Sequence, residues 1–300
     1  MKILLLGPNG QVGWELRRSL APLGQVIALD RQGADGLRGD LADAAGLAAT
    51  VRALRPQVIV NAGAYTAVDR AESEPALAER INAGAPAVLA REAAACGALL
   101  AHYGTDYVFD GSGERPWRED DATGPLSVYG RTKLAGEQAI VQSGCAHLIL
   151  RTSWVYAARG GNFAKTMLRL GAERERLTVI DDQWGAPTGA ELIADVSAHA
   201  IAQLLRQPGK AGTYHLAAAG ETSWFSYAKY VFAQAQQAQP AIKLIVNDIA
   251  PIATADYPTP ARRPHNSRLD TRRLQAAFDL ALPPWQDGVR RMLQEILQAP

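Results

Sequence analysis

Cysteine, excess charge and long apolar runs are all scarce in this sequence. Only two cysteines, Cys96 and Cys145, occur among the 300 residues, and their spacing fits neither a metal site nor a redox pair, so we expect free thiols packed as small hydrophobic side chains. The net charge of +1 argues against nucleic-acid and membrane-surface partners. No apolar run is long enough to span a membrane, and residues 1–6 are too few for the core of a signal peptide, so we expect a cytoplasmic protein.

The N-terminal residues carry the pattern of a dinucleotide-binding site. Residues 2–6 form a short apolar run that predicts a buried parallel strand, and residues 14–20 predict a helix. Between them the spacing G-x-x-G-x-x-G lets the backbone turn tightly and approach a pyrophosphate at the helix N-terminus. The alternative is a plain glycine turn. We expect the cofactor to contact Gly7, Gly10, Gln11, Val12 and Gly13.

A second predicted strand, residues 25–29, ends where a dinucleotide fold binds the adenosine ribose. Asp30 at this position favours NAD, because a carboxylate accepts hydrogen bonds from ribose hydroxyls. Arg31 follows directly, and a guanidinium there suits the 2′-phosphate of NADP, so both cofactors stay open. A solvated strand end is the alternative for both residues. Asp40 and Leu41 mark another strand-end loop, which we expect to pass the adenine.

Small residues follow a further predicted strand, residues 56–60, and would let a cofactor lie against the backbone. Predicted helices flank this strand at residues 44–54 and at the alanine-rich residues 76–95. Asn82 in the second helix is either a tolerated polar residue or a polar relay to the active site. The expected cofactor contacts here are Ala62, Gly63, Ala64, Tyr65 and Thr66.

Catalytic chemistry is expected on a predicted helix over residues 127–142. Tyr129 and Lys133 are four residues apart, which places both side chains on one helix face. An ammonium beside a phenol would lower the phenol pKa from about 10 towards the range of an acid-base catalyst. Thr105 follows the predicted strand 98–102, at the edge where doubly wound sheets bind ligands, and its hydroxyl would hold a substrate carbonyl or the Tyr129 oxygen. A solvated helix face and a backbone-capping threonine are the alternatives.

The order and separations of these motifs resemble the extended short-chain dehydrogenase/reductase superfamily. Within it, Thr-Asp-Tyr-Val-Phe-Asp-Gly at 105–111, Pro-Leu-Ser-Val-Tyr-Gly-Arg-Thr-Lys at 125–133 and Arg-Thr-Ser-Trp-Val-Tyr at 151–156 look like the dTDP-4-dehydrorhamnose reductase family. The match continues at 161–167 and 182–188 and at Arg263-Pro264, and it spans essentially the whole chain. The resemblance implies an α/β fold, a Rossmann-type doubly wound parallel sheet with a smaller C-terminal substrate-binding domain.

The resemblance also implies reduction of the 4-keto group of dTDP-4-dehydro-L-rhamnose by NADPH or NADH, the final step of dTDP-L-rhamnose synthesis. Hydride addition builds negative charge on the ketone oxygen, so the site needs a proton donor and hydrogen bonds aimed at that oxygen. Tyr129 would donate the proton, Lys133 would lower the tyrosine pKa and hold the nicotinamide ribose, and Thr105 would align the carbonyl. A homodimer is implied as well, with no catalytic metal and with Mg²⁺ considered at the subunit interface.

The C-terminal half is expected to bind the nucleotide sugar. We assign residues 1–150 to the cofactor domain, with 186–220 returning to it, and residues 151–185 and 221–300 to the substrate domain. Trp154 would lie against the deoxysugar, with a core position as the alternative. Arg263 leads the candidates for the diphosphate, because arginine forks match phosphate geometry. The proline-rich residues 251–264 predict an ordered loop over the substrate, and His265 is expected to be structural. Other substrate candidates, each alternatively a plain surface residue, are Asp106, Asn162, Lys165 and Gln183.

Two other functions compete with the reductase. A nucleotide-sugar dehydratase or epimerase keeps NAD bound and recycles its hydride, but dehydratases of the superfamily carry a glutamate where this chain has Tyr107. An epimerase needs little beyond Tyr129 and Lys133. A non-catalytic alternative is the regulatory subunit of methionine adenosyltransferase, which resembles these reductases and binds the cofactor. The presence of Thr105, Tyr129 and Lys133 favours catalysis, although one fold hosts many activities.

Overall fold

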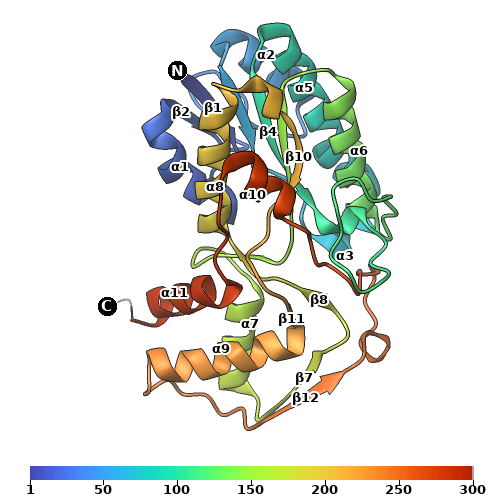
Figure 1. Cartoon of the computed structure of the whole chain (residues 1–300), viewed down its shortest axis with the longest axis vertical. Helices are drawn as coiled ribbons and strands as arrows, with labels where there is room; N and C mark the ends of the chain where they lie inside the picture. Colours follow the sequence, from blue (N-terminus) through green and yellow to red (C-terminus); the bar gives the residue numbers. More distant parts are fainter. Residues whose placement is uncertain (299–300) are drawn as a thin grey trace.

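Six parallel strands form the centre of the protein in a computed structural model, which describes residues 1–298 (Figure 1). Their spatial order is β2-β1-β3-β4-β5-β10, so the chain reverses direction across the sheet between β1 and β3. The predicted Rossmann-type sheet is therefore confirmed, and its ligand edge lies at the carboxyl ends of the strands. The strands are β1 Lys2–Leu6, β2 Gln25–Leu29, β3 Val58–Asn61, β4 Leu99–Thr105, β5 His147–Thr152 and β10 Gly212–His215.

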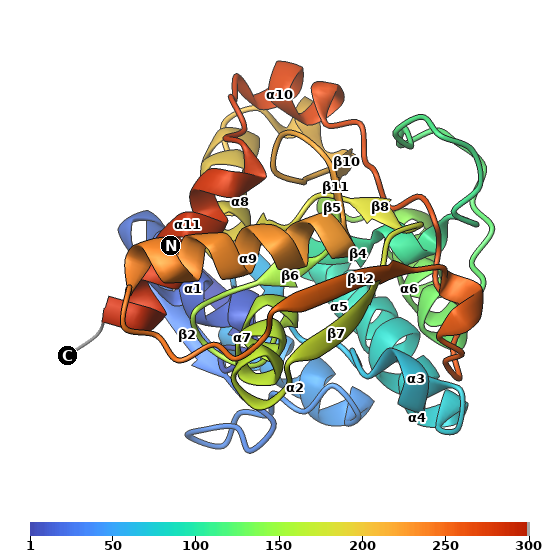
Figure 2. The same ribbon diagram turned by 90° about the horizontal axis from the view of Figure 1, so that it is seen from below.

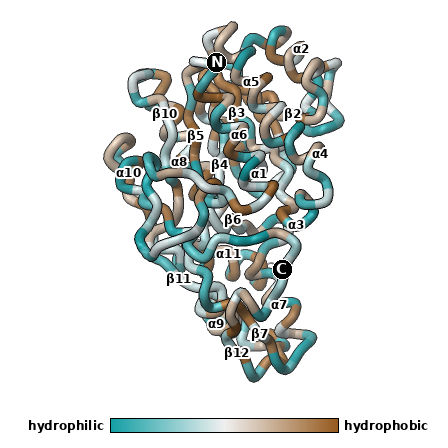
Figure 3. Tube along the Cα trace, turned by 90° about the vertical axis from the view of Figure 1, so that its right-hand side faces the viewer, coloured by the Kyte–Doolittle hydropathy of each residue, from teal (hydrophilic) through white to brown (hydrophobic). Residues whose placement is uncertain are grey.

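Helices cover both faces of this sheet. On one face α1 (Gln11–Leu20), α8 (Ala190–Leu204) and α10 (Arg272–Phe278) bury apolar side chains against alternate residues of the strands. On the other face α2 (Ala44–Leu54), α5 (Ala85–Cys96) and α6 (Val128–Gln142) cover the remaining residues. Because both faces are buried, the strands read as continuous apolar runs, and Figure 3 shows this hydrophobic colour along strands such as β5.

The alanine-rich helix predicted over residues 76–95 is not uniform. It begins as α4 (Pro75–Glu79), passes through one π-helical turn at Arg80–Gly84 and continues as α5. Asn82 lies in this turn, where α6 packs so closely that a Cβ on Gly136 would lie 2.1 Å from the Asn82 carbonyl oxygen. Single π turns of this kind are frequent at functional sites. Here the turn brings Asn82 to the catalytic helix.

A second hydrophobic core lies beyond the ligand edge of the sheet (Figures 1 and 2). It is built by α7 (Phe163–Glu173), α9 (Trp224–Ala238) and α11 (Trp285–Gln298), and by β7 (Arg176–Ile180) paired in parallel with β12 (Asp248–Ile252). Short elements complete the fold: α3 Val68–Ala71, β6 Val155–Tyr156, β8 Trp184–Gly185, β9 Thr188–Gly189, β11 Thr222–Ser223 and the 3₁₀ turns Ala21–Leu23, Asp106–Val108, Pro208–Lys210 and Thr254–Asp256.

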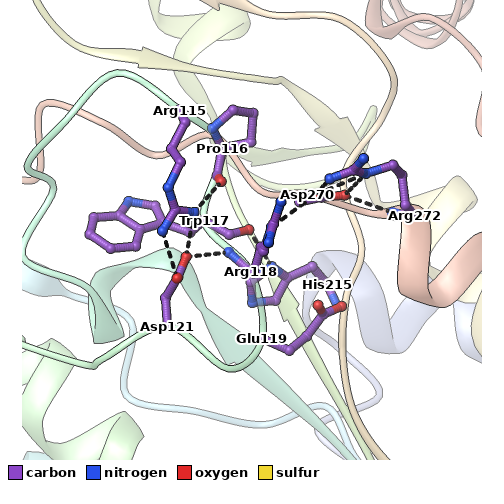
Figure 4. Close-up of polar contacts among 9 residues, drawn as sticks. All are labelled: Arg115, Pro116, Trp117, Arg118, Glu119, Asp121, His215, Asp270 and Arg272. Carbon is purple, nitrogen blue, oxygen red and sulfur yellow. Dashed lines mark hydrogen bonds and ion pairs between the residues drawn. The ribbon is translucent and has the colours of Figure 1, made fainter.

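The loop before α6 is held over the β10 edge of the sheet by polar contacts (Figure 4). Arg115 forms a two-pronged ion pair with Asp121, at 2.8 and 2.7 Å, within the loop. The Trp117 carbonyl accepts a hydrogen bond from His215 Nδ1 of β10 at 3.0 Å. The second contact ties the loop to β10. Among residues 1–298, no helix is long and apolar enough to cross a membrane.

Candidate active site

Tyr129, Lys133 and Thr105 meet at the carboxyl edge of the sheet. Tyr129 and Lys133 lie one turn apart on α6, whose first turn is capped by Ser127 accepting a hydrogen bond from the Gly130 amide at 3.2 Å. Thr105 is the last residue of β4 and is buried. Its hydroxyl donates to Asp106 Oδ1 at 3.2 Å and lies close enough to the Tyr129 phenol to oppose the rise of that group's pKa. Tyr129 and Lys133 thus share a face of α6, and Thr105 lies at the ligand edge of the sheet.

The protonation of Tyr129 differs from the prediction. Burial raises the pKa of Tyr129 to about 12, and the charges of Asp106 and Glu137 act in the same direction, while the Thr105 hydroxyl opposes them. The prediction that Lys133 lowers the pKa of Tyr129 is wrong for this structure. The Lys133 side chain turns to β4 instead, where its Nζ donates to the Tyr103 carbonyl at 2.6 Å, and burial lowers the pKa of Lys133 to about 8.

A buried carboxylic acid adjoins the catalytic groups. Asp106 is 2% exposed, and burial raises its pKa to about 7, against hydrogen bonds from Ser267 and Thr105. Its Oδ2 has no hydrogen-bond partner among the described residues. The Tyr107 ring stands edge-on to Tyr129, with centroids 5.5 Å apart. An uncompensated buried acid beside a phenol is an arrangement suited to contacting a polar substrate group.

The glycine-rich loop leaves no room for larger side chains at two of its positions. Gly7 follows β1 with φ +76° and lies directly against the loop after β3, so that a Cβ would lie 2.6 Å from the Gly63 nitrogen. A Cβ on Gly13 would lie 2.0 Å from the Gly7 carbonyl oxygen. Gly10 precedes the first turn of α1, whose free amides, with Gln11 and Val12, face the position where a pyrophosphate binds in this fold.

The other expected cofactor contacts gather along the same edge. Asp30 directly follows β2, and its carboxylate accepts hydrogen bonds from Asn9 Nδ2 at 3.1 Å and from the Gln32 amide at 2.9 Å. Asp40 caps its own loop through the Ala42 amide, and Leu41 packs on Gly63. Arg31, directly after Asp30, is exposed. Carboxylate and guanidinium are thus adjacent at the strand end where NAD and NADP differ.

Asn82 supports the loop after β3 rather than Lys133. Its side chain accepts a hydrogen bond from the Tyr65 amide at 2.8 Å and donates to the Tyr65 carbonyl and to Thr132 Oγ1, both at 3.1 Å. The loop with Ala62, Gly63, Ala64, Tyr65 and Thr66 is therefore fixed to α6. The predicted relay reaches only Thr132, the residue before Lys133.

The substrate candidates fall into separate groups. Trp154 has φ +48°, a strained value for this residue, and stacks on Trp224 with ring centroids 3.5 Å apart. Trp224 Nε1 donates to the Gln183 side chain, whose amide donates in turn to Thr254 at 3.1 Å. Gln183 is therefore buried and bonded at both ends, in a row that continues from Trp154.

Asn162 and Lys165 lie beside the cofactor loop. Asn162 caps α7 and also donates to the Gln11 side chain at 3.4 Å, while Lys165 donates to the Ala158 carbonyl at 2.7 Å. Arg263 lies elsewhere, and its guanidinium forms a fork with the Asp69 carboxylate of α3 at 3.0 and 2.7 Å. The structure therefore brings Asn162 to Gln11 and pairs Arg263 with a carboxylate.

Comparison with known proteins fits this arrangement. A family model described as the RmlD substrate binding domain matches residues 1–298. The chain belongs to this family. A relative of this RmlD-family chain, the dTDP-4-dehydrorhamnose reductase of Escherichia coli strain K12, is 57% identical over 296 residues, which cover 99% of this chain and 98% of the relative. The reductase of Burkholderia thailandensis is 47% identical, with 99% of both chains covered.

Solved structures agree with the family assignment. The dTDP-4-dehydrorhamnose reductase of Clostridium acetobutylicum superposes with a TM-score of 0.88 at 33% identity, covering all of both chains. That of Bacillus anthracis, solved in complex with NADP, gives a TM-score of 0.86 at 34% identity, with 98% of this chain and 99% of that chain covered. A UDP-glucose 4-epimerase from Brucella ovis shares the fold, with a TM-score of 0.79 at 17% identity.

Several residues of the site escaped the sequence analysis. His102 interrupts the apolar strand run at residues 99–101 as a lone polar residue, and this was the available signal. Asn61 ends β3 in register with it. Asp69, Glu137 and Trp224 carry no local pattern, because their partners lie far away in the sequence.

Proposed function

We propose that this chain reduces the 4-keto group of dTDP-4-dehydro-L-rhamnose to dTDP-L-rhamnose, with NADH or NADPH as hydride donor. The observation that carries the proposal is the convergence of Thr105, Tyr129 and Lys133 at the dinucleotide edge of an RmlD-family chain. Relatives bearing the reductase name cover nearly the whole chain, and a structural neighbour holds NADP. The protein is thus an oxidoreductase that uses a nicotinamide cofactor.

Residues of the chain would donate the proton and hold the ketone oxygen on which charge develops. A bound nicotinamide cofactor supplies the hydride. The pKa of about 12 keeps the Tyr129 phenol protonated at neutral pH, so that it can give its proton to the ketone oxygen as charge develops there. The Thr105 hydroxyl lies beside the phenol and would hold the same oxygen in line. Lys133 would hold ribose hydroxyls of the cofactor.

The reductase and its competitors differ in cofactor consumption. Purified protein is mixed with dTDP-4-dehydrorhamnose generated in place, and absorbance at the nicotinamide band is followed separately with NADH and NADPH. One mole of cofactor oxidised per mole of sugar supports the reductase and ranks the two cofactors. An epimerase would convert the sugar without net oxidation, and a regulatory binding protein would bind cofactor without turnover.

Tyr129→Phe tests the proton donor. We expect turnover to fall by about 10²-fold or more, because the phenylalanine ring has no proton to give, while the dissociation constant of the cofactor stays nearly unchanged. Single-turnover kinetics and cofactor fluorescence measure the two quantities. Unchanged turnover together with weakened cofactor binding would remove Tyr129 from the chemical step.

We also propose that different segments of the chain bind the cofactor and the nucleotide sugar. Residues 1–150 and 186–220 hold the cofactor, in line with the positions of α8 and β10 on the sheet. Residues 151–185 and 221–300 bind the nucleotide sugar, except that Leu274 and Phe278 of α10 pack in the core of the sheet. A homodimer, with Mg²⁺ at its interface, follows the family resemblance. Light scattering with added Mg²⁺ and with chelator measures the molecular mass.

A further inference from the structure

A row of buried polar side chains lies between the sheet and α6, beneath the catalytic edge. Asn61 of β3 and His102 of β4 are in register on adjacent strands, and both are 1% exposed. Lys133 of α6 lies over them and is 2% exposed. His102 Nε2 is 3.2 Å from Lys133 Nζ, and His102 Nδ1 is 3.2 Å from Asn61 Nδ2. The imidazole therefore connects the lysine with the end of β3.

The hydrogen atoms in this row are interdependent. Burial lowers the pKa of His102 well below its usual value, so the ring is neutral, with one N–H and one acceptor nitrogen. With Asn61 Nδ2 donating to Nδ1, the ring proton is on Nε2, and Lys133 must accept it as a neutral amine. If Lys133 is an ammonium, Nε2 must accept, Nδ1 carries the proton, and Asn61 must present its amide oxygen.

The second arrangement affects the cofactor loop. Asn61 Oδ1 accepts a hydrogen bond from the Gly63 amide at 3.3 Å when its nitrogen faces His102. Turning the amide to serve an ammonium exchanges this acceptor for a donor and breaks the bond to Gly63. The protonation of Lys133 and the anchoring of the loop after β3 are therefore linked through one ring.

We infer that His102 is a positioning residue for Lys133, a role that rests on the proposed function. By exchanging its two neutral tautomers it would hold the lysine nitrogen over β4 both as amine and as ammonium. Two contacts from β4, the Tyr103 carbonyl and His102 Nε2, leave one Lys133 hydrogen for the ribose side in either protonation state. His102 thus aims the lysine without touching substrate or cofactor.

Other charged groups face the same lysine and bear on its titration. Glu137 lies one turn further along α6 and favours the ammonium, and it is paired with Arg151 of β5 at 2.8 Å. Tyr129 lies one turn before Lys133, and Asp106 follows β4. Gly104 makes room for the pair, because a Cβ there would lie 2.2 Å from Glu137 Oε1. Variants at position 102 leave all these groups in place.

Three substitutions separate the two contacts of the ring. In His102→Gln the amide can reach Lys133 and can turn to offer either oxygen or nitrogen. In His102→Asn the amide reaches Asn61 but not Lys133. In His102→Leu both contacts are lost. The pH profile of kcat, the KM for the nucleotide sugar and the cofactor dissociation constant against pH are measured for each, relative to the unmodified protein.

We expect His102→Asn and His102→Leu to lower kcat about tenfold with KM for the sugar unchanged, since the loss arises in the chemical step. The lysine limb of the kcat profile should move to lower pH by about one unit, because a buried ammonium that loses a polar partner favours the amine. His102→Gln should restore both. The pH dependence of the cofactor dissociation constant should also change in His102→Asn and His102→Leu and be restored in His102→Gln. This titration needs no sugar, so it is informative even if the nucleotide sugar is a different one.

His215→Gln is the matched control, since His215 is a buried histidine of the same sheet whose ring contacts the Trp117 carbonyl (Figure 4). It should lower the melting temperature without moving the pH profiles. The inference would be overturned if His102→Asn restored kcat as fully as His102→Gln does. It would also be overturned if the pH profile of kcat were unchanged in both variants. If His102→Leu does not fold, the Asn and Gln pair still decides the matter.

Discussion

Asp106 shows how burial alone changes the chemistry of one side chain. The carboxyl is enclosed at the end of β4, and its pKa of about 7 means that it ionises near neutrality. In the unfolded chain the same group ionises near pH 4. Between these values the folded state binds more protons than the unfolded state, so this group lowers the free energy of unfolding as pH rises from about 4 to about 7.

Asp106→Asn should remove that pH dependence. The shift corresponds to about 4 kcal/mol, so we expect the variant to gain stability relative to the original chain as pH rises from 4 to 7, and to hold the gain above 7. Urea unfolding at a series of pH values measures the difference. Asp120→Asn, at an exposed aspartate of the loop before α6, is the control and should give a flat difference. A variant equally less stable at pH 5 and at pH 8 would contradict the raised pKa.

At the scale of residues, the sequence was informative where chemistry depends on local spacing. Tyr129 and Lys133 share a helix face by their separation, and Thr105 follows from the end of its strand. The direction of the Tyr129 pKa shift did not follow from the sequence, since it depends on how deeply the phenol is buried. It also depends on where Lys133 turns, which is set by His102 and Tyr103 of β4.

Among the elements, the glycine-rich turn and α1 form the most tightly constrained pair. A Cβ on Gly13 would meet three backbone atoms of Gly7 and Pro8 at 2.0 to 3.0 Å, whereas a Cβ on Gly10 would meet only the Gly7 oxygen, at an ordinary 3.6 Å. Backbone atoms cannot move aside as a flexible side chain can. The helix would have to shift away from the loop.

Gly13→Ala should therefore destabilise the protein by about 1–3 kcal/mol, while Gly10→Ala leaves its stability within about 0.5 kcal/mol. Thermal unfolding of both variants without cofactor makes the comparison. A Gly10→Ala melting temperature as low as that of Gly13→Ala would show that the turn, and not the approach of α1, is limiting.

Element prediction succeeded for the strands of the sheet and for α11, which was expected over residues 285–297, and it missed the strands of the second core. Strands such as β1 and β2 are short apolar runs ended by a turn signal, which is a local pattern. By contrast, β7 pairs with β12 although α8, β10 and α9 lie between them in the sequence, and β12 contains Pro251, a residue that predicted a loop. An edge strand tolerates proline where no ladder hydrogen bond is needed.

At the scale of the whole molecule, Arg263 and Asp69 join segments 194 residues apart. Arginine was expected to bind the diphosphate, and in the structure a carboxylate occupies its fork. The two roles are compatible if the diphosphate takes the place of Asp69. The two roles predict different effects on KM when the Asp69 carboxylate is removed.

Arg263→Lys should raise KM for the nucleotide sugar about tenfold with the cofactor dissociation constant unchanged, because lysine lacks the planar fork. Asp69→Asn should lower that KM or leave it unchanged, since it frees the guanidinium. Steady-state kinetics over sugar concentration provides the values. If both variants raise KM equally and lose the same thermal stability, Arg263 serves only to connect the two segments.

The position of β10 has a consequence for the order in which the chain is made. This outermost strand pairs with β5, yet it is translated only after α7, β7 and α8. On the ribosome, the nascent sheet therefore keeps an open, apolar edge at β5 until residue 215 has left the exit tunnel, and such an edge invites pairing with other chains. Slow translation between β5 and β10, or a stop codon there, would leave a polypeptide that depends on chaperones.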